Sequence, residues 1–239
     1  MSNLNLSLRL SAAAQWVPQY ARLCDVGTDH AALPIWLMQQ GRIHSAIATD
    51  IRTGPLERAR KNVERYGFSG KIQLRLCDGL SGVTAPEVDT ASICGMGGKM
   101  MMAILEAAPW TQNEVRLILQ PMKSLGELRK WLSQHGYCIE QERVIWEEGH
   151  WYTLLSVVGK NDETVLTPGM EEVGIPNRWC REENRLNYLN YAVERLERQK
   201  KGLERSEKTP DQNRMAYLQA ALAELAIWRH SLEKGVWPI

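Results

Sequence analysis

The sequence predicts an α/β fold: a doubly wound open sheet of about seven strands, followed by an antiparallel hairpin of two helices. Three observations lead to this prediction. Short apolar runs alternate with helix-forming segments over the first two thirds of the chain, the last two such runs have no helix between them, and after residue 166 only helical spacing of apolar residues remains.

Five short runs rich in apolar and β-branched residues each lead into a turn or the start of a helix. They cover residues 21–26, 45–51, 71–77, 89–94 and 115–120. Between the second and third runs, Pro55 occupies a first helical position and Gly67 closes the segment. The apolar residues of this helix recur at spacings of three and four: Leu56, Ala59, Val63 and Tyr66. Such alternation is typical of βαβ units, whose strands are parallel.

The last two predicted strands cover about residues 138–147 and 151–158, after a helix that ends near Gly136. Only a few residues around Gly149 separate these two strands. A parallel crossover needs roughly a dozen residues or more, so we expect an antiparallel hairpin at the edge of a mostly parallel sheet.

The C-terminal part of the chain has a different pattern. A linker is indicated by a cluster of residues that interrupt regular structure: Pro168, Gly169, Gly174 and Pro176. Two amphipathic helices follow, starting near Leu186 and Met215, and Thr209, Pro210 and Gln212 predict a capped start for the second. We therefore predict a sheet domain over residues 1–165, and a linker with a helical hairpin domain over residues 166–239.

The composition excludes several classes of protein. Lys and Arg total 29 and Asp and Glu total 28, so any polyanion must be bound by locally clustered positive charge. The five cysteines contain no CxxC pair, which disfavours zinc or iron–sulfur sites and a disulfide framework. The polar N-terminus lacks the apolar segment of a signal peptide, and no run is long enough to span a membrane. We expect a cytoplasmic protein with no bound metal, no membrane contact and no obligate protein partner.

Acidic residues and a glycine stand where the first predicted strand ends, in the sequence DVGTDHA. Asp25, Gly27 and Asp29 lie in this turn, directly before a segment with helical spacing. Glycine lets the backbone approach a ligand, and a helix N-terminus offers free amide groups. The GxGxxG fingerprint of dinucleotide sites is absent, and carboxylates are unsuited to a pyrophosphate. We therefore expect a positively charged ligand.

Three further strand ends carry similar residues. Asp50 ends the second run, where an acidic residue binds ribose hydroxyls in this class of fold. Asp78 and Gly79 end the third run, where a carboxylate can accept from an adenine amino group, and the fourth ends in GMGG at residues 95–98. Any one of these is commonly a cap or a turn. Together, at the edge where such sheets bind ligands, they suggest a nucleoside with a cationic sulfonium: S-adenosylmethionine rather than NAD or ATP.

Other candidate residues are less specific. His30 is a candidate because it follows Asp29 on the ligand loop. Basic residues near the strand ends are candidates for phosphate contacts, although exposed lysines and arginines often serve only solvation: Arg9, Arg52, Lys99, Lys123, Arg129 and Lys130.

Nine short motifs occur in one order along the chain: LSLRL, DVGTDHA, ATDI, GPLERA, CDGL, GMGG, LILQP, LRKWL and GHWYTLL. With them the chain resembles the bacterial tRNA (adenine(22)-N(1))-methyltransferase family, from about Leu6 to the C-terminal hairpin. The resemblance implies a Rossmann-like class I methyltransferase sheet with a C-terminal helical, coiled-coil-like domain. In the C-terminal part of the chain, the resemblance lies in helical character more than in particular residues.

The resemblance also implies that the strand-end loops bind S-adenosylmethionine. By position, the binding residues are then Asp25, Gly27, Asp29, His30, Asp50, Ile51, Asp78, Gly79, Gly95, Met96 and Gly97. The implied reaction transfers the sulfonium methyl group to ring nitrogen N1 of an adenine in tRNA. That nitrogen keeps an in-plane lone pair, so alignment of the reacting atoms is the main task.

We expect individual residues to have distinct roles in methyl transfer and in tRNA binding. Asp29 is the expected carboxylate that stabilises positive charge arriving on the purine, and His30 is an alternative proton relay. For tRNA binding we expect contacts from Arg9, Lys99, Lys123 and Arg129, together with the C-terminal hairpin. The target adenine must be unstacked to reach the site, at a cost of a few kcal/mol that shape recognition has to offset.

Two alternatives stay open at the level of sequence. One is another class I methyltransferase that acts on ribosomal RNA or a small molecule, with the helical hairpin used for dimerisation. The other is a non-catalytic module that binds S-adenosylmethionine and recruits a partner through the hairpin.

Overall fold

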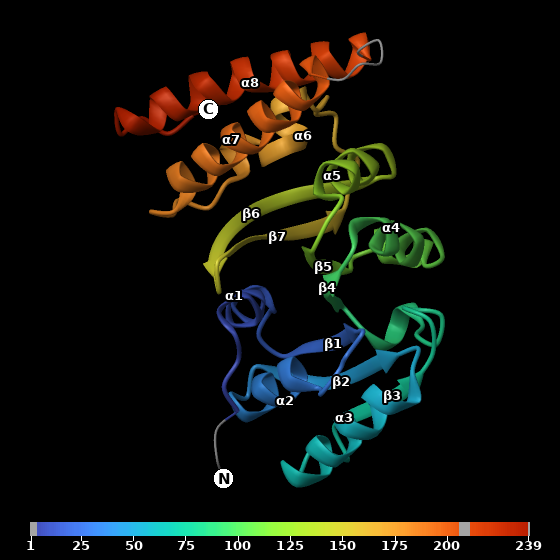
Figure 1. Cartoon of the computed structure of the whole chain (residues 1–239). Helices are drawn as coiled ribbons and strands as arrows, with labels where there is room; N and C mark the ends of the chain where they lie inside the picture. Colours follow the sequence, from blue (N-terminus) through green and yellow to red (C-terminus); the bar gives the residue numbers. More distant parts are fainter. Residues whose placement is uncertain (1–3, 206–210, 239) are drawn as a thin grey trace.

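A computed structural model describes residues 4–205 and 211–238 (Figure 1). Seven strands form one sheet in the order β3-β2-β1-β4-β5-β7-β6, which confirms the predicted doubly wound architecture. The strands are β1 (Ala21–Val26), β2 (Ile43–Asp50), β3 (Ile72–Leu76), β4 (Thr90–Met96), β5 (Arg116–Pro121), β6 (Tyr137–Glu147) and β7 (His150–Gly159). Strands β1 to β5 pair in parallel, whereas β7 pairs antiparallel with both β5 and β6.

Eight α-helices occur in the described part of the chain. They are α1 (Leu8–Trp16), α2 (Ala32–Gln39), α3 (Thr53–Arg65), α4 (Gly98–Glu106), α5 (Leu125–Gln134), α6 (Pro168–Val173), α7 (Arg185–Glu204) and α8 (Gln212–Glu233). Three short 3₁₀ helices lie at Ala85–Glu87, Pro109–Gln112 and Pro176–Arg178.

Helices cover both faces of the sheet. One core contains Met101 of α4 and Leu128 of α5 with strand residues such as Ile93 and Leu117. The other contains Ala13 of α1, together with residues of α2 and α3, on the opposite face of the strands. Alternate residues of a strand point to opposite faces, so the continuous apolar runs of β1, β4 and β5 match strands that are buried on both sides.

The C-terminal helices pack on the antiparallel edge of the sheet. Helices α7 and α8 lie side by side beyond β6 and β7, at the opposite end of the molecule from α3 (Figure 1). Their apolar faces enclose a third core that also contains Val144 of β6 and, at its border, Trp151 of β7. The division at residues 165 and 166 into two domains stays a prediction.

The segment predicted as a linker contains a short helix instead. Thr167 caps α6 by accepting a hydrogen bond from the Met170 amide, and Pro168 takes the first helical position. The predicted cap of the last helix, Thr209 with Pro210, lies outside the described residues. Helix α8 begins at Gln212, and the Asp211 side chain accepts from the amides of Asn213 and Arg214.

Arg129 is not a surface residue, so the prediction that it contacts tRNA is wrong. Its side chain is 0% exposed, and its guanidinium donates to one carboxylate oxygen of Glu142 at 2.7 and 3.1 Å. Glu142 is equally buried, and Arg185 of α7 donates to the Glu142 carbonyl at 3.1 Å. Arg129 therefore joins α5 to β6 inside the protein.

Among the described residues, no helix combines the length and apolar character that crossing a membrane requires.

Candidate functional site

The loops that follow β1 and β3 are tied to the end of β2 by hydrogen bonds. The amide of Gly27 donates to the Thr49 carbonyl at 2.8 Å, and the Thr49 hydroxyl donates to the Gly79 carbonyl at 2.9 Å. A third bond runs from the Cys77 amide to the Asp50 carbonyl at 3.1 Å. These contacts hold the two loops and the end of β2 in fixed relative positions at the carboxyl edge of the sheet.

Two similar bonds tie the loop after β4 to the loop after β5. The Met122 amide donates to the Met96 carbonyl at 2.8 Å, and the Gly98 amide donates to the Lys123 carbonyl at 2.9 Å. A Cβ atom on Gly98 would lie 2.6 Å from the Ser124 carbonyl oxygen, so only glycine permits this close approach of α4 to the segment before α5.

A cavity of about 470 Å³, here named the strand-end cavity, opens between these loops. It brings together eight of the predicted binding residues: Gly27, Asp50, Ile51, Asp78, Gly79, Gly95, Met96 and Gly97. Val26, Arg52, Cys94, Met100 and Ile104 complete its lining. The cavity therefore combines carboxylates from β2 and β3 with an apolar wall from α4.

The two carboxylates of the strand-end cavity differ in their surroundings. Asp50 is 6% exposed and accepts a hydrogen bond from the Arg52 amide at 2.8 Å, which fixes the direction of its carboxylate. Asp78 is exposed. Asp50 ends β2, Asp78 follows the end of the adjacent parallel strand β3 by two residues, and Ile51 stands exposed beside Asp50 at the rim.

Gly27 has a left-handed backbone conformation, with φ of +73°. A Cβ atom there would lie 2.1 Å from the terminal methyl carbon of Met96, at the end of β4, so the flexible Met96 side chain would have to shift. Gly95 also has a positive φ, of +81°, but nothing lies within 4 Å of the position of an added Cβ. The positive φ favours glycine at both positions, and at Gly95 open space lies beside the backbone.

A second cavity of about 300 Å³, here named the adjoining cavity, shares Val26, Gly27, Cys94 and Gly95 with the first. It holds the other three predicted binding residues together with a basic residue of α1 and a residue of β5: Asp25, Asp29, His30, Arg9 and Gln120. Gln120 was not among the site residues predicted from the sequence. The available signal was a polar residue at the end of an otherwise apolar strand, in LILQP.

Asp25 lies at the floor of the adjoining cavity. It is 8% exposed and accepts a hydrogen bond from the Ser92 hydroxyl at 2.7 Å. Burial raises the pKa of its carboxyl group above the ordinary range, because the charged form loses hydration.

Asp29 and His30 lie at the exposed rim of the adjoining cavity. The carboxylate of Asp29 forms an ion pair with the Arg58 guanidinium of α3, and the Nε2 atom of His30 lies 3.3 Å from its other oxygen. The hydrogen bond from Arg58 lowers the pKa of Asp29 below the ordinary range, so this carboxylate is ionised at neutral pH. Asn62 of α3 also donates to the His30 carbonyl, at 3.0 Å.

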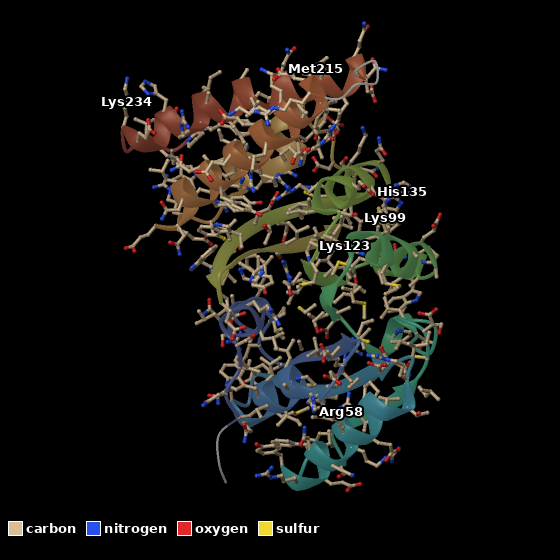
Figure 2. The ribbon with its side chains drawn as sticks, viewed as in Figure 1. Arg58, Lys99, Lys123, His135, Met215 and Lys234 are labelled. Carbon is tan, nitrogen blue, oxygen red and sulfur yellow. The ribbon has the colours of Figure 1, made fainter. Side chains whose placement is uncertain are left out.

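The basic candidates for tRNA contact lie in different surroundings. Lys99 and Lys123 lie on the side of the strand ends nearer the C-terminal helices, and Arg58 lies on the other side (Figure 2). The Lys99 ammonium is 3.2 Å from a Glu127 oxygen, whereas the stem of Lys123 covers Gly97, which lines the strand-end cavity. Arg9 lines the adjoining cavity.

Residues 4–205 and 211–238 contain no group of three or more His, Cys, Asp or Glu side chains placed to hold a metal ion.

Comparison with known proteins agrees with this geometry. A family model described as a methyltransferase domain matches residues 6–155, which include all strands of the site. The tRNA (adenine(22)-N(1))-methyltransferase of Bacillus subtilis (strain 168) is 36% identical over 156 residues, or 65% of this chain. That alignment spans 66% of the Bacillus protein, slightly less than two thirds of its length.

Solved structures extend the similarity to nearly the whole chain. The B. subtilis M1A22 tRNA methyltransferase TrmK is 29% identical, with a TM-score of 0.77 over 97% of this chain and 98% of its own. Sp1610 of Streptococcus pneumoniae, in complex with S-adenosyl-L-methionine, is 35% identical, with a TM-score of 0.79 over 92% of this chain and 99% of its own. The C-terminal helices are included in these superpositions.

The carboxyl-edge cavities, the matched domain and the relatives that align over nearly their full length all agree. The chain belongs to the methyltransferase family and, within it, to the tRNA (adenine(22)-N(1))-methyltransferases.

Proposed function

We propose that this chain transfers the methyl group of S-adenosylmethionine to ring nitrogen N1 of adenine 22 in tRNA. The observation that carries the proposal is the strand-end cavity, in which Asp50 and Asp78 flank glycine-rich loops at the carboxyl edge of a doubly wound sheet. The names of the relatives supply the target base and position, and the complex of Sp1610 supplies the cofactor.

The residues of the strand-end cavity suit the adenosyl part of this cofactor. Asp50 has a fixed and nearly buried carboxylate at the end of β2, where it can accept from ribose hydroxyls. Asp78 can accept from the adenine amino group, and Ile51 and Met100 offer apolar surface for the ring. The open space beside Gly95 leaves room for a ligand that continues towards the adjoining cavity.

When bound, S-adenosylmethionine supplies the methyl group, whose bond to sulfur breaks as its bond to N1 forms, so that the positive charge passes from sulfur to the adenine. The chain contributes alignment and electrostatics. Asp29 is ionised and held by Arg58, so it can stabilise the positive charge on the purine without first losing a proton. His30 is within 3.3 Å of Asp29 and is placed to share a proton with it.

The tRNA is held mainly by other residues. Lys123 stands exposed beside the site, and Lys99 is close to it (Figure 2), so both can meet phosphates that flank the target adenine. Helices α7 and α8 lie on the same side of the strand ends as Lys99 and Lys123, and they offer a second contact region for folded RNA. A tRNA substrate also agrees with the cytoplasmic location that we expect.

The central experiment incubates the protein with labelled S-adenosylmethionine and transcripts of all tRNAs of its host, then maps modified adenines by reverse-transcription stops. We expect label in tRNAs that carry adenine at position 22, with a stop at that position and none after its replacement by guanine. Transfer to ribosomal RNA or a small molecule would favour the first alternative. Cofactor binding without transfer to any acceptor would favour a binding module.

A charge reversal separates tRNA binding from cofactor binding. We expect Lys123→Glu to raise the KM for tRNA about tenfold or more while the cofactor Kd stays within twofold, because the ammonium would meet phosphate rather than the cofactor. Lys71→Glu is the matched control, since Lys71 is exposed just before β3, at the far edge of the sheet. Equal effects of the two substitutions on tRNA binding would remove Lys123 from the proposed contact region.

A further inference from the structure

The hairpin of β6 and β7 projects beyond the carboxyl edge of the sheet. Leu119 of β5 pairs with Leu155 of β7, and β5 continues for only two residues past that pair. Trp151 precedes Leu155 by four residues, so Trp151 and its cross-strand partner Trp146 lie about 7 Å beyond the end of β5. The hairpin tip, residues 145–152, therefore extends past the edge at which the cavities open.

Helix α1 holds the hairpin tip beside the adjoining cavity. Arg9 lines that cavity, and its guanidinium lies 4.8 Å from the centre of the Tyr152 ring and 3.6 Å from a Glu147 oxygen. Glu147 also accepts a hydrogen bond from the Leu8 amide. These contacts come from both strands of the hairpin, so the tip has a fixed position at the edge of the site.

Trp146 lies on the face of the sheet that α5 and α7 cover. Alternate residues of a strand point to opposite faces, so Glu142, Val144 and Trp146 share one face of β6. Glu142 binds Arg129 of α5, and Val144 belongs to the core that α7 and α8 enclose. Lys123 lies just before α5. Trp146 is therefore on the side of the sheet where we propose that Lys123 and the C-terminal helices contact tRNA.

Much of the Trp146 ring is left uncovered by the protein. Its neighbour Trp151 is partly buried and meets Tyr188 of α7 edge to face, with ring centres 5.7 Å apart. Trp146 leans on Trp151, with ring centres 4.9 Å apart and planes inclined by 54°, and it stays 47% exposed. The two inner rings thus support the Trp146 indole and leave a broad aromatic surface open at the rim of the site.

The proposed reaction provides an occupant with matching chemistry. An adenine that leaves its stack to be methylated also deprives its neighbours of a stacking partner. Proteins usually hold such unstacked bases on exposed aromatic side chains, because every base has a π-face. The target adenine itself must enter the site, so the rim suits a neighbouring base. The C-terminal helices are no alternative occupant, since they already pack on Trp151 and leave Trp146 exposed.

We infer that Trp146 stacks on a base next to the target adenine and so holds the tRNA with that adenine directed into the site. This inference rests on the proposed function, because it takes tRNA as the substrate. It gives Trp146 a positioning role, in contact with the RNA but away from the reacting atoms. It also connects the two proposed regions of tRNA contact, beside Lys123 and along α7 and α8, across one face of the sheet.

Three substitutions separate stacking from simple apolar contact. Trp146→Ala removes the ring, Trp146→Leu keeps an apolar side chain without a π-face, and Trp146→Phe keeps a ring. We expect kcat/KM for tRNA to fall about 5- to 150-fold in Trp146→Ala, nearly as far in Trp146→Leu, and at most about threefold in Trp146→Phe. The Kd for S-adenosylhomocysteine, measured by calorimetry, should stay within about twofold in all three.

Tyr20→Ala is the matched control. Tyr20 is an aromatic residue that is 73% exposed, but it directly precedes β1 and so lies at the opposite edge of the sheet. Its substitution should change neither kcat/KM for tRNA nor cofactor affinity. Thermal unfolding checks that each variant is folded. If Trp146→Ala does not fold, Trp146→Leu and Trp146→Phe still allow the test, because they differ mainly in the aromatic ring.

Altered tRNAs identify the stacked base. Two transcripts would each lack one base, at the position directly before or directly after adenine 22, and would be compared with intact tRNA. With one of these two transcripts, Trp146→Ala and the native chain should have the same kcat/KM, because the base that the indole contacts is missing. With the other transcript and with intact tRNA, the variant should be slower than the native chain.

Several results would overturn the inference: equal losses in Trp146→Leu and Trp146→Phe, the same loss in Trp146→Ala with all three tRNAs, or a parallel loss of cofactor affinity. Unchanged tRNA kinetics in Trp146→Ala would also overturn it and would favour a protein contact at this surface. In that case a native chain that methylates tRNA keeps the proposed function intact. A native chain that methylates no tRNA would instead overturn the proposed function, and the inference with it.

Discussion

The carboxylate of Asp29 is held by the guanidinium of Arg58. Asp29 lies in the loop between β1 and α2, whereas Arg58 lies on α3. Arg58 reaches it from α3, on the side of the strand ends away from the C-terminal helices (Figure 2). The proposed catalytic carboxylate thus has a fixed direction and a depressed pKa, and both properties depend on one residue that the sequence argument did not single out.

Removal of Arg58 should therefore change how the reaction depends on pH. In Arg58→Ala the pKa of Asp29 returns towards its ordinary range, so the acidic limb of the kcat/KM profile should move to higher pH. At neutral pH Asp29 stays ionised in both proteins, and only the loss of orientation should lower kcat/KM, by roughly tenfold. Arg60→Ala is the control, because Arg60 also lies on α3 but pairs with Glu57. Superimposable acidic limbs would exclude Asp29 as the titrating group.

Asp29 and Asp50 should respond differently to loss of charge. Asp29→Asn removes a charge that acts on the transition state, so kcat should fall roughly 10- to 100-fold with little change in cofactor affinity. Asp50→Asn weakens a hydrogen bond to the ribose by about 1.5–3 kcal/mol, which corresponds to roughly a 10- to 150-fold rise in the cofactor Kd. Single-turnover rates and calorimetry measure the two effects separately, and the reverse pattern would exchange the assigned roles.

The strands and the edge of the sheet that carries the site were predictable from the sequence because they depend on local patterns. The run at residues 21–26 matches β1 in both bounds, and Asp50, Asp78 and Gly95 stand at strand ends as expected. Helix α6 was missed because its prolines and glycines suggested a linker. Thr167 before Pro168 was the signal of a capped helix start.

The remaining differences between the sequence-based predictions and the structure arise from contacts between residues that are distant along the chain. Arg129 sits on an amphipathic helix with basic neighbours, and only the fold brings the buried Glu142 against it. Gln120 is one polar residue among apolar neighbours, and only the fold places it in a cavity formed with other strands. Charge and burial of this kind cannot be derived from spacing along the chain.

The Arg129–Glu142 pair gives a prediction about stability. Glu142→Gln should lower the free energy of unfolding by about 3–5 kcal/mol, because it leaves buried guanidinium groups without a counter-charge. The exposed Lys99–Glu127 pair is the control, and Glu127→Gln should cost at most about 1 kcal/mol. Urea unfolding at pH 7 measures both. The double variant Arg129→Met with Glu142→Leu should recover only part of the loss, since it removes the Arg129–Glu142 pair but keeps the Arg185 guanidinium buried beside it. An equally unstable double variant would show that the unpaired Arg129 charge is not the main cause of the loss.

The connection between β7 and α6 should stabilise the fold in a pH-dependent way. Arg178 donates to both oxygens of Asp162, at 2.5 and 3.0 Å, and the Asp162 side chain is 7% exposed. The hydrogen bonds from Arg178 lower the pKa of Asp162 to about 2. Because the folded-state pKa lies below the unfolded value of about 3.9, the stabilisation is fully present above pH 4 and is lost as the pH falls to 2. A shift of this size corresponds to about 2 kcal/mol at pH 7.

Asp162→Asn should therefore lower the free energy of unfolding by about that amount at pH 7, and the difference from the parent protein should shrink towards zero near pH 2. Chemical unfolding at several pH values measures this difference, in which the titration of other groups cancels. Glu163→Gln is the matched control, since Glu163 follows Asp162 directly and should give a small difference that does not vary with pH. A constant difference for Asp162→Asn between pH 2 and 7 would mean that the carboxylate acts through packing and that its ion pair with Arg178 adds no stability.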